Sequence, residues 1–116
     1  MDSQETEELV ELLQRNSDKL TIVEGKRDKN VLCSLGFVKV LTLSGGIYET
    51  AEKINDAEVL VLTDFDAEGK QIAKKLNLFL QHAGVKADME TRRKVGLLLA
   101  KLKITKIEEL RGVLNG

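Results

Sequence analysis

The sequence lacks several features that mark secreted, membrane and disulfide-bonded proteins. Its single cysteine, Cys33, excludes an internal disulfide, and the context VLCSLG predicts a small buried side chain. No apolar run approaches the roughly 18 residues of a membrane-spanning helix. The N-terminus, MDSQETEELVELL, is acidic where a signal peptide is basic and then apolar. We therefore expect a cytoplasmic protein that does not bind membranes.

The sequence also contains no proline, and its net charge is close to zero. The absence of proline, together with many Lys and Glu residues, is compatible with a heat-adapted source. The formal net charge is −1, which excludes a global electrostatic attraction to phosphate backbones. Within residues 1–16 every charged residue except Arg15 is acidic, whereas the charged residues from Lys86 onward are mostly basic. Any site for a polyanion must therefore be local.

The residues that are present alternate between helical and strand-like patterns. Apolar residues at helical spacing predict helices over residues 3–16, 27–35, 47–54 and 69–82, and two more beyond residue 90, separated near 104–105. Short apolar runs predict buried strands at 20–23, 38–43, 58–63 and 85–87. Asp2 and Glu5 fit a capping box for the first helix. The alternation predicts an α/β fold: a three-layer, Rossmann-like sandwich with a mainly parallel four-stranded sheet and a helical C-terminus.

Three acidic residues follow two of the predicted strands. Glu24 ends the first strand, Asp64 ends the third, and Asp66 comes two residues later. The carboxyl ends of parallel strands open onto one rim, so these side chains converge if the two strands are neighbours. Converging carboxylates repel one another unless a cation compensates. Oxygen ligands alone favour Mg²⁺, with Mn²⁺ as a substitute, and such a site points to phosphoryl chemistry.

Asp66, Asp64 and the nearby Glu68 also have ordinary structural explanations, whereas Glu24 sits where active-site groups sit in such sheets. Asp66 could cap the next helix, Asp64 could be a turn residue, and Glu68 more often complements a helix dipole than binds a metal. Glycines on the same rim could admit a phosphate or simply make tight turns; they are Gly25, Gly45, Gly46 and Gly69.

The segments TIVEGKRDKNVL and VLVLTDFDAEGKQIAKKL together resemble the Toprim domain. That domain is shared by topoisomerases, bacterial-type primases, overcoming-lysogenization-type nucleases and the ribonucleases that mature 5S ribosomal RNA. The resemblance runs from about residue 20 to residue 90 and includes both family motifs in order. It implies a single Toprim domain over residues 1–116, with a core at about 18–90.

The resemblance also implies roles for individual residues. Glu24 would be the general acid or base, while Asp64 and Asp66 would hold Mg²⁺. Gly25 and Gly69 match the family's turn glycines and so are candidates to position the substrate. Two further residues of the first motif have expected roles: Asp28 orders the loop, and Lys26 either reaches a phosphate or is simply solvated.

The sequence departs from the larger Toprim proteins. Topoisomerases need a tyrosine nucleophile in another domain, whereas the one tyrosine here, Tyr48, begins a helix inside the predicted core and is interpreted as packing. Zinc modules and long polymerase regions, which primases carry, are absent. The chain therefore resembles the small stand-alone Toprim proteins.

We expect a Mg²⁺-dependent phosphodiester nuclease acting on RNA or DNA. Lys26, Arg27, Arg92 and Arg93 are candidates to position the phosphate backbone. Arg92, Arg93 and Lys94 could instead be the exposed face of a helix. The alternative function is a catalytically weak or inactive module that binds nucleic acid or docks on a processing complex, because one small domain offers little surface for gripping a duplex. A homodimer or a protein partner could supply more surface.

Overall fold

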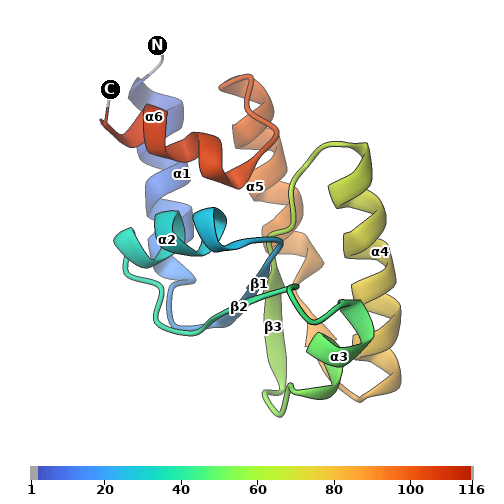
Figure 1. Cartoon of the computed structure of the whole chain (residues 1–116). Coiled ribbons are helices and arrows are strands. Elements are labelled where there is room, and N and C mark those ends of the chain that lie inside the picture. Colours follow the sequence, from blue (N-terminus) through green and yellow to red (C-terminus); the bar gives the residue numbers. More distant parts are fainter. Residues whose placement is uncertain (1–2, 116) are drawn as a thin grey trace.

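A four-stranded parallel sheet forms the centre of the computed structural model, which describes residues 3–115 (Figure 1). Its strands lie in the spatial order β2-β1-β3-β4, and each neighbouring pair is parallel. The strands are β1 (Leu20–Val23), β2 (Val40–Thr42), β3 (Glu58–Val61) and β4 (Lys86–Ala87). The predicted parallel α/β fold is confirmed. β1 and β3 are neighbours, with Ile22 opposite Val61, so their carboxyl ends meet at the same rim.

Helices cover both faces of this sheet. They are α1 (Ser3–Arg15), α2 (Lys26–Ser34), α3 (Ile47–Glu52), α4 (Ala67–His82), α5 (Met89–Lys101), the short 3-10 turn η1 (Ile107–Glu109) and α6 (Leu110–Asn115). Alternate residues of β3 point to opposite faces: Leu60 packs with α1, α2, α5 and the C-terminal segment, whereas Val61 packs with α3 and α4. Both faces of the central strands are therefore buried, as the near-continuous apolar runs require.

The ends of several elements differ from the sequence-based expectation by a few residues. The second strand is shorter than predicted, and Val38, expected within it, is 77% exposed. Cys33 is exposed rather than buried, because the inward stripe of α2 is already formed by Val31 and Leu32. Tyr48 and Phe79 pack edge to face with ring centroids 5.7 Å apart, on the outside of α3 and α4. Phe79 therefore does not face inward, as its spacing had indicated.

Two sequence-based expectations remain: a capping box at the N-terminus and the absence of a membrane-spanning helix. The capping box proposed from Asp2 lies outside the described residues. Among the described helices, none combines the length and apolar character that crossing a membrane requires.

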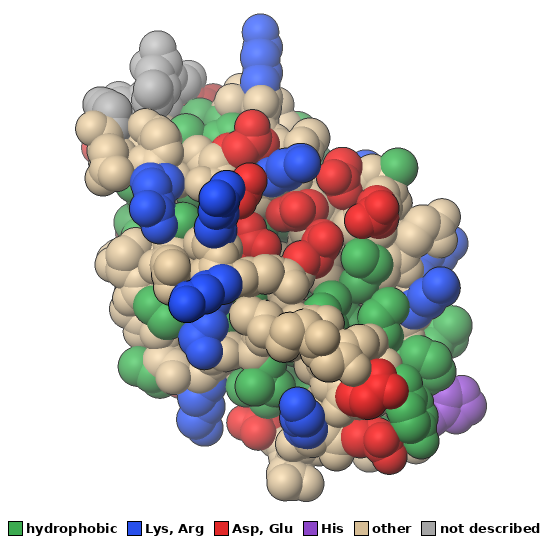
Figure 2. Space-filling model, in the orientation of Figure 1, with side chains coloured by type: hydrophobic (Ala, Val, Ile, Leu, Met, Phe, Trp, Pro, Cys, Tyr) green, Lys and Arg blue, Asp and Glu red, His purple; other side chains and the backbone are tan. Residues whose placement is uncertain are grey.

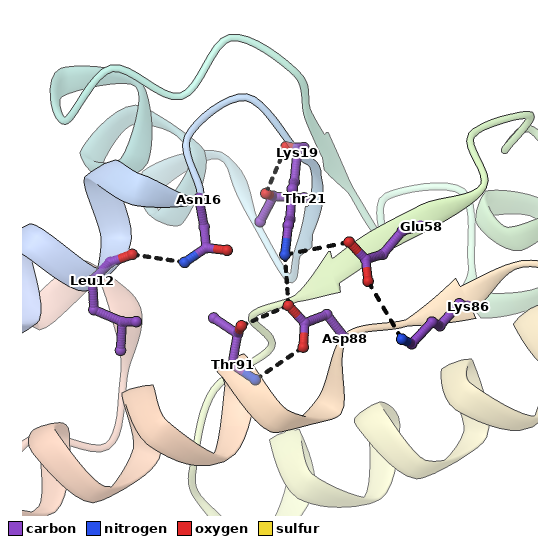
Figure 3. Close-up of polar contacts among 8 residues, drawn as sticks. All are labelled: Leu12, Asn16, Lys19, Thr21, Glu58, Lys86, Asp88 and Thr91. Carbon is purple, nitrogen blue, oxygen red and sulfur yellow. Dashed lines mark hydrogen bonds and ion pairs between the residues drawn. The ribbon is translucent and has the colours of Figure 1, made fainter.

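A network of charged residues lies at the amino ends of β1 and β3, whereas the acidic residues of the predicted site follow their carboxyl ends. Figure 3 shows this network. The Lys19 ammonium lies 2.7 Å from Asp88 Oδ2 and 3.3 Å from Glu58 Oε1. Asp88 also caps α5 by accepting a 3.0 Å hydrogen bond from the Thr91 main-chain N–H. Burial alone would raise the pKa of Asp88, but its bonds to Lys19 and Thr91 lower it to about 2. This network ties the start of β1 to β3 and α5.

Candidate functional site

The two sequence motifs meet where β1 and β3 end. Glu24 directly follows β1, and its Oε2 accepts a 2.8 Å hydrogen bond from the main-chain N–H of Asp64. Acidic side chains gather on this part of the surface, with Lys and Arg side chains beside them (Figure 2). The predicted convergence of Glu24 with the segment of Asp64 and Asp66 is therefore present in the fold.

Asp64 carries the largest electrostatic cost in this cluster. Its pKa is raised to about 6, chiefly by burial and also by the charges of Asp28, Glu24 and Asp66, against a lowering by the Ile107 hydrogen bond. That bond joins the Ile107 main-chain N–H to Asp64 Oδ1 over 2.9 Å. The ionised form of Asp64 is therefore disfavoured unless a cation offsets the surrounding charge.

Asp66 is the N-cap of α4, as its ordinary structural explanation predicted. Its Oδ1 accepts a 2.8 Å hydrogen bond from the main-chain N–H of Gly69. Within residues 3–115, no hydrogen bond is formed by the other carboxylate oxygen of Asp66 or of Asp64. The cap on α4 and the Ile107 hydrogen bond thus each occupy one oxygen of an aspartate and leave the other oxygen for a cation.

The rim glycines serve the local fold in different ways. Gly69 is buried, and a Cβ at this position would overlap the main chain of Asp64. Only glycine therefore lets α4 start so close to the acidic loop. Gly46 has a φ of +97°, which also favours glycine. Gly25 has an extended conformation with φ −143°, and its N–H donates to Asp28 Oδ2 over 3.1 Å.

Asp28 is buried and holds two main-chain segments together. Burial raises its pKa, while its hydrogen bonds with the main chain of Gly25 and of Glu108 lower it. Together with Asp64, it thus engages the main chain of two consecutive residues, Ile107 and Glu108, at the start of η1. The loop-ordering role expected of Asp28 matches this geometry. No pattern in the sequence predicts that η1 joins the rim, because the groups that η1 contributes are main-chain N–H groups.

Arg92 differs from both of its expected roles. It is only 5% exposed, so it is neither part of a solvated helix face nor a surface contact for phosphate. Its guanidinium donates to the carbonyls of Val61, Thr63 and Asp64 over 3.1, 2.8 and 3.1 Å. Burial lowers its pKa to about 10, opposed by the charges of Glu24 and Asp64, so Arg92 stays charged at pH 7.

The position of Arg92 could have been found in the sequence. Arg92, Val95 and Leu99 form the buried stripe of α5, at the spacing of one helix face. An arginine on an apolar stripe must satisfy its charge internally. In this fold it closes the end of β3 and places a fixed positive charge beneath the acidic cluster.

The other basic candidates remain on the surface. Lys26 and Arg27 are exposed at the start of α2, immediately after Glu24. Arg93 is exposed and pairs with Glu90 on the same helix, and Lys94 is exposed beside it. Glu68 is exposed in the first turn of α4. Lys26, Arg27 and Arg93 are thus accessible to a phosphate backbone.

The residues at this rim fit a hydrated magnesium ion better than an enclosed metal cage. Within the described part of the chain, no three acidic, His or Cys side chains are grouped closely enough to hold an ion together. Magnesium, however, keeps several waters and needs only one or two protein carboxylates. Asp64 and Asp66 supply that number of carboxylates, and a bound cation would offset the charge that raises the pKa of Asp64.

Comparisons with known proteins agree with the fold. The Toprim domain model matches residues 19–95. The chain is 33% identical over 105 residues to a UPF0292 protein of Archaeoglobus fulgidus, covering 89% of this chain and 84% of that protein. It is 39% identical over 111 residues to a UPF0292 protein of Thermococcus gammatolerans, covering 91% and 80%. A solved structure described as a putative protein from Aquifex aeolicus superposes with a TM-score of 0.74 at 30% identity, covering 89% of this chain and 95% of that one.

Proposed function

The chain belongs to the Toprim domain family, and from that premise we propose that it is a Mg²⁺-dependent phosphodiester nuclease acting on RNA or DNA. The Toprim fold is related to nucleic acids and to metal binding, which supports this class of chemistry. The observation that carries the proposal is the 2.8 Å hydrogen bond between Glu24 Oε2 and the Asp64 N–H. It holds a carboxylate beside two aspartates, as a proton carrier next to a metal site requires.

Each residue of the rim has a separate task in this proposal. Asp64 and Asp66 hold Mg²⁺, which when bound supplies positive charge to the phosphate that is cleaved. Glu24 is fixed through Oε2, and its second oxygen exchanges a proton with the attacking or leaving oxygen. Arg92 holds the main chain of Asp64 in place from below. Lys26, Arg27 and Arg93 contact phosphates of the substrate, which positions the strand without reading its sequence.

A second candidate function is a binding module that docks on nucleic acid or on a processing complex, as a monomer or a homodimer. Two observations favour it. Ile107 already donates to Asp64 Oδ1, and no cluster of three possible ligands is formed within residues 3–115. Such a module would bind nucleic acid without turnover.

The experiment that separates the two functions is cleavage of labelled RNA and DNA in Mg²⁺ or Mn²⁺. We expect Glu24→Gln and Asp64→Asn to abolish metal-dependent cleavage while the fold is retained. Glu68→Gln is the matched control. Glu68 is an exposed acid in the first turn of α4, so its substitution should leave cleavage unchanged. Cleavage that survives in both site variants would exclude the nuclease proposal. Binding without cleavage by the parent protein would favour the docking module.

A further inference from the structure

A cavity of about 530 Å³ lies beside the acidic loop, between α4, α5 and the connection from α5 to η1. Most of its lining is apolar and includes Phe65, Met89, Leu97, Ala100 and Ile104. Its volume lies within the range of sites for small organic ligands, about 300–1,000 Å³. The proposed nuclease chemistry does not account for this cavity.

Part of the wall of the cavity is an aromatic ring that packs against a buried cation. The guanidinium carbon of Arg92 lies 4.1 Å from the centroid of the Phe65 ring, and both side chains line the cavity. Gly96 lets the ring lie against α5, because a Cβ there would come within 3.0 Å of it. Aromatic rings and arginine planes are the surfaces on which unpaired nucleobases stack.

Two exposed cations contribute to the same cavity. Lys70 comes from α4 and Arg93 from α5, and both are solvent-exposed. The pairing of Arg93 with Glu90 is a surface ion pair, which contributes little and can be exchanged for a phosphate. An apolar cavity with a π surface and neighbouring cations is complementary to a flat aromatic group joined to an anion.

The cavity is also next to the proposed cleavage site. Phe65 is the residue between Asp64 and Asp66, so its Cα atom lies about 3.8 Å from the Cα atom of each aspartate. A base in the cavity would therefore bring its own strand to the acidic rim. Bases in a duplex are stacked and paired, and inserting one would cost a few kcal/mol of unpairing.

We propose that this cavity binds an unpaired nucleobase of a single-stranded nucleic acid, with Lys70 and Arg93 on the adjoining phosphates. The proposal rests on the proposed function for its substrate and narrows that substrate to single strands. Phe65 provides the stacking surface, with the buried Arg92 packed against its ring, and the apolar side chains exclude water from the base.

The test is equilibrium binding of labelled oligonucleotides in EDTA, measured by fluorescence anisotropy. Three probes of equal length are compared: a single strand, an abasic single strand with the same phosphates, and a duplex. We expect the single strand to bind about tenfold more tightly than either other probe, as stacking of one base, worth about 1–3 kcal/mol, predicts. Ala100→Phe, at an exposed position that lines the cavity, should remove this preference and leave abasic binding unchanged.

Two further variants test the cavity by removing side-chain atoms, so they cannot distort the cavity as an added phenylalanine could. Leu97→Ala removes a 54% exposed leucine of the lining, and Leu78→Ala removes a 57% exposed leucine elsewhere. We expect only Leu97→Ala to weaken binding of the single strand, by about fivefold, because the exposed half of this leucine would be buried against the base.

The outcomes separate this inference from the nuclease proposal. Equal binding of the three probes, no binding of any probe, or an unchanged preference in both cavity variants would overturn the base site, whatever the cleavage assay shows. A base-dependent preference without cleavage would support the base site and count against the nuclease.

Discussion

Glu24 and Asp64 are joined by a 2.8 Å hydrogen bond from the main-chain N–H of Asp64 to the Glu24 carboxylate, although 40 residues separate them. The bond depends on the register of β1 and β3, in which Ile22 lies opposite Val61. A shift of one residue would turn the side chains of the strand to the opposite face. The hydrophobic pattern of the two strands therefore fixes the geometry of the acidic rim.

Replacing Asp64 by Asn should stabilise the metal-free protein at pH 7. Burial raises the pKa of Asp64 to about 6, so the folded state binds more protons than the unfolded state between about pH 4 and 6. Wild-type stability therefore falls as pH rises through this window. Asn keeps an oxygen for the Ile107 N–H without the charge. We expect a gain of about 1 kcal/mol after solvent screening, measured by urea unfolding in EDTA.

Magnesium should make the wild-type protein more stable than Asp64→Asn, the reverse of the order expected without metal. Mg²⁺ should raise the unfolding midpoint of the wild-type protein, because a ligand that binds only the folded state stabilises it. The midpoint of Asp64→Asn should respond little, whereas Glu68→Gln should behave like wild type. A Mg²⁺ response in Asp64→Asn equal to that of wild type would argue against Asp64 as a ligand.

Arg92→Met should be among the most destabilising single substitutions in this chain. It removes the donor to three main-chain carbonyls and the internal cation near Glu24 and Asp64. Losing a buried charged partner costs about 3 kcal/mol or more. Arg93→Met is the matched control on the same helix and should change the unfolding free energy by less than about 0.5 kcal/mol. Comparable effects of the two substitutions in urea unfolding would contradict the internal role of Arg92.

Gly69→Ala should destabilise the fold by about 2 kcal/mol, because its Cβ would overlap the main chain of Asp64. Relief of that overlap requires α4 and the acidic loop to move apart, so metal binding should weaken as well. Gly112→Ala is the control in α6, where no atom lies within 4 Å of the added Cβ. It should be neutral or stabilise by about 0.5–1 kcal/mol through helix propensity. Thermal unfolding with and without Mg²⁺ measures both effects.

The Lys19 and Asp88 pair should contribute to stability only above acidic pH. Because the pKa of Asp88 is lowered to about 2 in the folded protein, its contribution is complete above the unfolded value of about 3.9 and is lost as pH falls through 2. Asp88→Asn should cost about 1 kcal/mol at pH 7, with the difference from wild type vanishing towards pH 2. Asp56→Asn, in an exposed pair with Lys39 at 3.8 Å, should show little change at any pH.

The part of this site that sequence predicts well is the part fixed by strand ends. Apolar runs locate β1 and β3, and the geometry of parallel sheets places Glu24 and Asp64 on one rim. The prediction of a solvated position for Arg92 is wrong: three consecutive basic residues suggest an exposed face, whereas the spacing of Arg92 with Val95 indicates burial. The contacts of η1 could not be predicted, since a main-chain N–H leaves no pattern in the sequence. Cys33 was misplaced because an apolar neighbourhood does not specify which side of a short helix faces solvent.

The hydrogen bond from Ile107 to Asp64 has a consequence for the order of folding. Ile107 follows all four strands in the chain and lies 43 residues beyond Asp64, so this contact closes a long loop at a large cost in chain entropy. During synthesis, the acidic loop leaves the ribosome well before its donor does. Asp64 can therefore remain hydrated while the strands pair, and its burial is completed only when the C-terminal segment docks.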